Sequence, residues 1–194
     1  MRTATVKRKT KETDICLSID LDGKGVYKVA TGIGFLDHMM ELFSRHSLID
    51  IDLSVSGDTF VDCHHTVEDT GIVLGKALKE ALKDKKSIAR YGFASVPMDE
   101  SLTNVTVDLS GRAYTVYNCP VSGGSIGEMD FETLEEFVRA LSDNLGANIH
   151  VNVQYGSNRH HVAESIFKAL ARSLRQAISI DEKESGIPST KGEI

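Results

Sequence analysis

The chain has 194 residues and a mass of 21.2 kDa, with 41% hydrophobic and 26% charged residues, the composition of an ordinary globular protein. A net charge of −6 and three cysteines without CxxC spacing argue against nucleic acid as the main partner and against a disulfide framework. No apolar run approaches the ~20 residues of a membrane span, and the basic N-terminus lacks the apolar stretch of a signal peptide. The sequence therefore predicts a cytoplasmic protein that binds neither nucleic acid nor membrane.

The first half of the chain is expected to fold as strand, strand, helix, strand, helix. Residues 14–22 alternate apolar and polar, and after a turn at 22–25 the chain returns over 25–32 as the second strand of a hairpin. Apolar residues at helical spacing, with one alternating stretch between them, then predict a helix, a strand and a helix over residues 35–46, 48–55 and 64–83.

The same order recurs in the second half. Residues 103–109 and 112–118 predict a hairpin around Ser110-Gly111. A helix, a strand and a last helix follow, over residues 130–145, 148–155 and 160–179. The polar tail, residues 181–194, has no periodicity and is expected to be a loop.

An HHxxE motif stands at the same point in both halves, which makes a chance likeness improbable and indicates an internal duplication. Residues 19–24 also match residues 107–112. We therefore predict one α+β domain over residues 1–194, made of duplicated ββαβα halves with a sheet on one side and helices on the other. The halves span about residues 1–88 and 89–180, followed by the tail 181–194. The motif residues are His64, His65 and Glu68, and His160, His161 and Glu164.

The HHxxE motifs have the spacing of metal ligands. A histidine and a glutamate four residues apart lie about 40° apart on a helix and can chelate one ion, whereas the adjacent histidine points about 100° away. That spare histidine could reach the ion of the other half. His38 and Glu136, at equivalent places on the earlier helices, are expected to point away from their own cores, either as ligands at an interface or as solvated polar residues. The predicted ligand sets are His38, His65, His160 and Glu164 for one ion, and His64, Glu68, Glu136 and His161 for the other.

The longest motifs resemble, in order, those of the imidazoleglycerol-phosphate dehydratase family of histidine biosynthesis. They are GIGFLDHMMELFSRH, DCHHTVEDTGIVLGKAL, DLSGR, NRHHVAESIFKALARSLRQA and PSTKG, and the likeness runs from about residue 8 to the C-terminus. The resemblance implies a duplicated fold shared with a ribosomal-protein domain. It also implies two Mn²⁺ ions per active site, no organic cofactor, and a homo-oligomer of 24 subunits built from trimers, with active sites between subunits. Many members have histidine where this chain has Glu136, although a carboxylate can also bind Mn²⁺.

The implied activity is that of a hydro-lyase, which converts D-erythro-imidazole glycerol phosphate to imidazole acetol phosphate and water. By the same resemblance, Glu12 is an acid/base and His46 a positioning or proton-transfer residue, and both contact the substrate. The resemblance also implies a phosphate-binding set consisting of Arg90, Arg112, Lys168, Ser189, Thr190 and Lys191.

Metal ions suit this reaction because the proton to be removed lies beside an imidazole rather than a carbonyl. A Lewis acid on the ring stabilises the charge that develops there. Two alternatives stay open from the ligands alone. A di-metal hydrolase would release inorganic phosphate, and a metal-storing cage would have no use for Arg90, Arg112 and Lys168.

Overall fold

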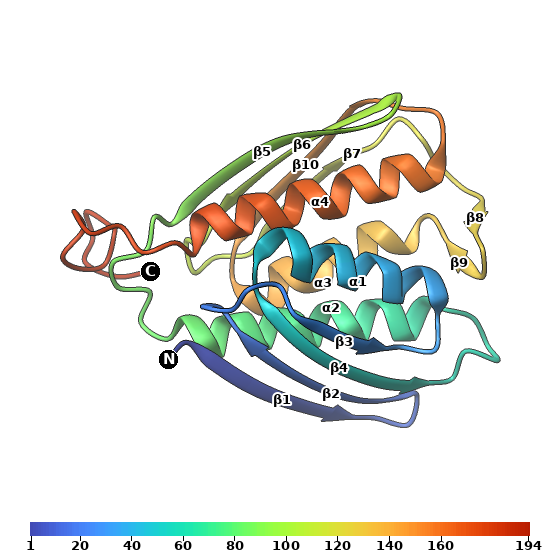
Figure 1. Ribbon diagram of the computed structural model, residues 1–194, viewed down its shortest axis with the longest axis horizontal. Coiled ribbons are helices and arrows are strands. Elements are labelled where there is room, and N and C mark those ends of the chain that lie inside the picture. The colour runs from blue at the N-terminus through green and yellow to red at the C-terminus, as the bar shows by residue number, and fades with distance from the viewer.

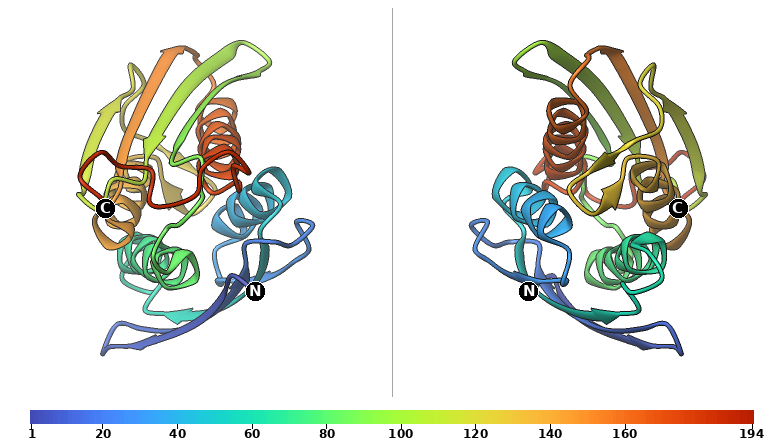
Figure 2. Two further views of the ribbon diagram at one scale, coloured as in Figure 1. Left: turned by 90° about the vertical axis from the view of Figure 1, so that its left-hand side faces the viewer. Right: turned by 90° about the vertical axis from the view of Figure 1, so that its right-hand side faces the viewer.

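The computed structural model describes residues 1–194 and consists of two four-stranded sheets with four helices between them (Figure 1). Seen from either end, the layers follow one another as sheet, helices and sheet (Figure 2). The first half holds strands β1 (Thr3–Lys9), β2 (Thr13–Asp20), β3 (Tyr27–Ala30) and β4 (Asp50–Gly57), and helices α1 (Gly34–Ser47) and α2 (His64–Leu82).

The second half repeats this order and adds a short hairpin, β8 (Ser125–Ile126) and β9 (Met129–Asp130). The sheet strands run β1-β2-β4-β3 in the first half and β5-β6-β10-β7 in the second, so the duplicated α+β fold is confirmed. The remaining elements are β5 (Tyr91–Met98), β6 (Ser101–Asp108), β7 (Tyr114–Asn118), α3 (Thr133–Leu145), β10 (Asn148–Tyr155) and α4 (Arg159–Ala177).

The helices pack across the halves. Helix α1 of the first half lies against α4 of the second, and α2 lies against α3. The prediction of a sheet on one side and helices on the other therefore holds for each half, but the whole molecule has its helices in the middle. This exchange of partners brings the ends of helices from both halves together, and it positions the site described below.

The four-stranded sheet of each half has one strand more than the sequence predicted, and the short β8–β9 hairpin was not predicted either. Strands β1 and β5 were missed, and each is an edge strand that precedes the predicted elements. In β1, alternate side chains are only half-buried and the others are exposed, because an edge strand covers little of the core. Its sequence, TATVKRK, therefore has no clear apolar face and is dominated by basic residues, so it was not predicted as a strand.

The predicted hairpins are wrong in both halves. Strand β3 pairs in parallel with β4, and β7 pairs in parallel with β10, so the last strand of each half lies between the two expected partners. The first residue of this last strand, in β4 and in β10, forms hydrogen bonds with the turn between the two strands that were expected to form a hairpin. Asp50 accepts hydrogen bonds from the backbone N–H groups of Lys24 and Val26, both at 2.8 Å. In the second half the Asn148 amide donates to Ser110 Oγ at 2.7 Å.

A single core of 46 buried residues joins the two halves. At its centre the rings of Phe137 on α3 and Phe167 on α4 lie 5.0 Å apart, and both are fully buried. The tail 181–194 contains no helix or strand, as predicted. It nevertheless folds back on the body, since Ser87 N–H donates to Gly186 O and the Arg90 guanidinium donates to Pro188 O, at 2.8 and 2.7 Å.

Candidate active site and metal centre

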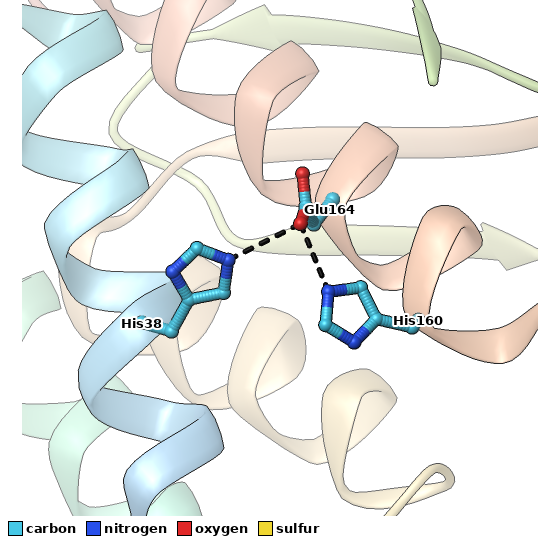
Figure 3. A group of neighbouring side chains, drawn as sticks. All are labelled: His38, His160 and Glu164. Carbon is cyan, nitrogen blue, oxygen red and sulfur yellow. Dashed lines mark hydrogen bonds and ion pairs between the residues drawn. The ribbon is translucent and has the colours of Figure 1, made fainter. Parts of the chain in front are cut away.

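Three predicted metal ligands meet between α1 and α4 (Figure 3). His160 and Glu164 stand one turn apart on α4, which begins at a fixed place because the Asn158 side chain caps its first turn. His38 reaches across from α1. The Nε2 atoms of His38 and His160 lie 3.1 and 2.9 Å from Glu164 Oε1. The three ligand atoms lie within 4.8 Å of one another, and no other three such side chains do so in the molecule.

The Glu164 carboxylate is held ionised at the centre of this group. Burial alone would raise its pKa, but hydrogen bonds from Lys168, His38 and His160 hold that pKa at about 2. Lys168 Nζ lies 2.5 Å from Oε2, so the two histidines face one oxygen and the lysine holds the other. Lys168, expected in the phosphate-binding set, thus lies beside the metal ligands in this chain.

The equivalent group between α2 and α3 is more open. His64 Nε2 lies 3.7 Å from Glu68 Oε2, one turn further along α2. Glu136 lies on α3, which packs against α2, and its half-buried carboxylate makes no hydrogen bond or ion pair. It does not come within 4.8 Å of both other ligands. The chain thus provides a second set of donors without drawing them together.

The second histidine of each motif turns to other partners. His65 Nδ1 lies 3.0 Å from Asp58 Oδ2, and its Nε2 lies 3.8 Å from Glu12 Oε1. The hydrogen bond to Asp58 raises the pKa of His65. Accordingly, His65 does not join His38, His160 and Glu164 within one chain, although it was predicted to share their ion.

His161 behaves in the same way in the second half. Its Nδ1 lies 2.6 Å from Glu100 Oε2 and its Nε2 lies 3.6 Å from Asp99 Oδ2. The hydrogen bond to Glu100 raises the pKa of His161. Hence neither predicted four-residue ligand set is complete in a single chain.

His46 and Glu12 lie in different surroundings. His46 is half-buried near the end of α1, and burial, followed by the nearby charges of Lys168 and Arg172, lowers its pKa. It is therefore neutral at pH 7 and can accept a proton. Glu12 is exposed in the turn between β1 and β2. No hydrogen bond or ion pair joins it to His46.

Five of the six residues expected to bind phosphate line one cavity of about 670 Å³ under the C-terminal tail. Arg90 is largely engaged there, since its guanidinium donates to Asp108 at 2.7 and 3.2 Å and to Pro188 O at 2.7 Å. Arg112 makes no side-chain hydrogen bond and is free for an anion. The five residues are Arg90, Arg112, Ser189, Thr190 and Lys191.

This cavity lies far from the metal ligands of the same chain. The Arg90 N–H donates to Ala177 O at the last residue of α4, whereas Glu164 lies near its first turns. Ala177 lies thirteen residues beyond Glu164 along the α-helix, which is roughly 20 Å at ~1.5 Å per residue. A small substrate cannot span that length, so one chain does not supply both parts of a site in contact.

Sequence reasoning missed the carboxylates that hold the spare histidines. Asp99 and Glu100 form the β5–β6 turn, and Glu12 lies in the equivalent β1–β2 turn. Had β1 and β5 been predicted, the repeat would have aligned these two turns and shown that each carries an acidic residue. Asp58, in the loop before α2, has no such signal.

The chain is similar to curated and solved proteins along its whole length. A family model described as imidazoleglycerol-phosphate dehydratase matches residues 31–174. The chain belongs to the imidazoleglycerol-phosphate dehydratase family. Relatives of that name from Geobacter sulfurreducens and Methylorubrum extorquens are 55% and 52% identical over 193 and 195 residues, covering 100% of this chain and 99% and 100% of theirs.

Two crystal structures of imidazoleglycerol-phosphate dehydratases have the same fold. The protein from Staphylococcus aureus gives a TM-score of 0.83 at 39% identity, over 92% of this chain and 99% of that one. The Pyrococcus furiosus protein, in complex with (S)-C348, gives 0.85 at 35% identity, over 97% and 100%. Membership in the dehydratase family makes the chain a hydro-lyase of histidine biosynthesis. None of its helices has the length and apolarity needed to cross a bilayer.

Proposed function

We propose that the chain dehydrates D-erythro-imidazole glycerol phosphate to imidazole acetol phosphate, with two Mn²⁺ ions per active site. The observation that carries the proposal is the group of His38, His160 and Glu164, which the fold assembles from both halves. Two imidazole nitrogens and an ionised carboxylate are donors that suit Mn²⁺, and no cysteine takes part. The residues present therefore fit the metal that the family resemblance implies.

The proposed ligands of one ion are His38, His160 and Glu164, completed by a His65. Those of the other are His64, Glu68 and Glu136, completed by a His161. When bound, the metal supplies Lewis acidity toward the imidazole ring of the substrate, which makes the neighbouring C–H acidic. Glu164 is ionised in advance by Lys168, so metal binding requires no proton release from this carboxyl group.

Proton transfer falls to His46 and Glu12 in this proposal. His46 is neutral near pH 7 because burial and neighbouring cations lower its pKa, so it can accept or relay a proton. Glu12 serves as the acid/base at the reacting carbons. Its carboxylate is exposed and lies 3.8 Å from His65 Nε2, next to a proposed metal ligand.

The active site is shared between copies of the chain. The phosphate cavity and the metal ligands of one chain lie roughly 20 Å apart along α4, and His65 and His161 do not reach the sets to which they are assigned. Each site becomes complete if a neighbouring subunit supplies the phosphate cavity and the missing histidine. We infer a homo-oligomer for this reason, and a particle of 24 subunits built from trimers from the family resemblance. The chain acts in the cytoplasm as one domain, with halves of about 1–88 and 89–180 and the tail 181–194 covering the phosphate.

A product assay on the metal-loaded protein tests the proposal. Incubation with imidazole glycerol phosphate should yield a new ketone without inorganic phosphate, and exhaustive chelation should abolish it until Mn²⁺ is returned. Release of inorganic phosphate would favour a hydrolase instead. Full turnover without metal would exclude the mechanism.

A further inference from the structure

We propose that Asp58 and Glu100 are positioning residues. Each holds the second histidine of an HHxxE motif in the tautomer that carries its proton on Nδ1, so that Nε2 is free to bind a metal ion. The inference rests on the proposed function, because it takes His65 and His161 to be metal ligands.

In the first half, the contact between Asp58 and His65 permits only one tautomer of the neutral His65 ring. Both carboxylate oxygens of Asp58 face Nδ1 of His65, at 3.0 and 3.2 Å. An ionised carboxylate only accepts hydrogen bonds, so Nδ1 must donate, and Nε2 of the neutral ring then bears the lone pair. The Asp58 side chain is only 15% exposed, which limits competition from water. Its backbone N–H donates to Glu12 O at 3.0 Å, which fixes the loop that carries it.

In the second half, a glutamate rather than an aspartate contacts Nδ1 of the corresponding histidine. Glu100 Oε2 lies 2.6 Å from Nδ1 of His161. Its other oxygen accepts from the backbone N–H groups of Asn158 and Ser157, at 2.7 and 3.2 Å. Glu100 therefore ties the β5–β6 turn to the segment that begins α4, and it fixes the direction of the ring.

The two carboxylates do not occupy equivalent positions in the duplicated fold. Asp58 lies in the β4–α2 loop and Glu100 in the β5–β6 turn. Duplication alone therefore does not explain why both contact Nδ1. The other proposed histidine ligands, His38, His64 and His160, all face their carboxylate with Nε2. A common presentation of Nε2, with Nδ1 bonded to a carboxylate where one is available, is the arrangement that orients metal-bound imidazole.

Amide variants should separate a tautomer effect from a loss of charge. In Asp58→Asn the side chain can still turn its oxygen toward His65, because Asp58 has no other side-chain partner. In Glu100→Gln one oxygen must serve two backbone N–H groups, so the new NH₂ group faces Nδ1 of His161 and favours the wrong tautomer. If charge alone mattered, the two variants would behave alike.

The experiment titrates full-length, metal-stripped protein with Mn²⁺ and follows free Mn²⁺ by electron paramagnetic resonance. Glu100→Gln and Asp58→Ala should each weaken one class of sites by roughly 10–100-fold, and Asp58→Asn should weaken it less. Glu80→Gln, which removes an exposed charge sixteen residues beyond His64 on α2, roughly 24 Å at ~1.5 Å per residue, is the control and should bind as the wild type does. Solid-state ¹⁵N spectra of histidine-labelled metal-free protein should show the His161 proton moving from Nδ1 to Nε2 in Glu100→Gln.

The outcomes are distinct. If wild-type protein binds Mn²⁺ and all variants match it, or if the histidine spectra do not change, the positioning role is wrong while the proposed function stands. If wild-type protein binds no Mn²⁺, the proposed function fails and this inference fails with it. Should Glu100→Gln not fold, the comparison of Asp58→Ala with Asp58→Asn decides, and equal affinities there would overturn the inference.

Discussion

His38 Nε2 and Glu164 Oε1 lie 3.1 Å apart although 126 residues separate them in the chain. The contact joins α1 of the first half to α4 of the second. Neither half can form this pair alone, because each supplies one of the two residues, and the packing of α1 against α4 brings them together. The duplication therefore creates the metal group at the junction between two copies of one ancestral unit.

Lys168 should affect the metal site as well as the substrate. In metal-free wild type, the hydrogen bonds to Glu164 hold its pKa at about 2, below the unperturbed value of 4.5. The stability this adds is fully present above pH 4.5 and is lost as pH falls toward 2. Lys168→Met should move this loss to higher pH, which urea unfolding across pH 2–6 would detect. The exposed Lys79→Met is the control. An unchanged pH profile with only a higher KM would make Lys168 a phosphate ligand alone.

Arg112→Ala should weaken substrate and phosphate binding without removing metal. Arg112 lines the tail cavity and has no side-chain partner of its own. A hydrogen bond to a charged group contributes roughly 1.5–3 kcal/mol, so affinity should fall at least about tenfold. Steady-state kinetics and metal analysis of the same sample check both parts. Arg175→Ala, an exposed arginine outside that cavity, serves as the matched control. An unaltered KM in Arg112→Ala would remove the residue from the phosphate site.

Gly71→Ala should destabilise the protein even though alanine favours helices. A Cβ at Gly71 would lie 2.7 Å from Phe137 O and 3.1 Å from Ala140 Cβ, where α2 crosses α3. Alanine gains up to about 1 kcal/mol in helix propensity, whereas overpacking costs roughly 1–3 kcal/mol. Thermal unfolding should show a lower midpoint. Gly34→Ala, at a helical glycine that faces open space, should not lower it. Equal midpoints in the two variants would show that α2 and α3 can move apart to admit the methyl group without loss of stability.

Metal and assembly should be linked. His65 and His161 do not complete their ion sets within one chain, so a bound ion would connect neighbouring subunits and stabilise the assembled state by mass action. Protein stripped of metal and held below the histidine pKa of ~6.5 should fall to a smaller species, expected to be a trimer, and Mn²⁺ at neutral pH should restore the large particle. Size exclusion with light scattering measures this. A large particle that survives both treatments would mean that other contacts hold the subunits together.

The repeat, the positions of all four helices and the fold class could be predicted from the sequence. Apolar residues three and four positions apart predict the helices, and the HHxxE motif marks the same helix start in both halves. Strand partners could not be predicted in this way. Alternation shows that residues 25–32 form a strand, but it does not show that this strand pairs in parallel with β4, where Asp50 holds the turn before β3.

By itself, the sequence determined the chemistry that is available: histidines and glutamates at chelating spacing, and cations and hydroxyls in DLSGR and PSTKG. The tertiary structure alone decided which of them meet. It brought His38 to His160 and Glu164, placed Lys168 on that carboxylate, and set Arg112 in the tail cavity with Arg90, which lies at the far end of α4. Spacing along a helix fixes only near neighbours, whereas contacts between helices of different halves depend on how the whole core packs.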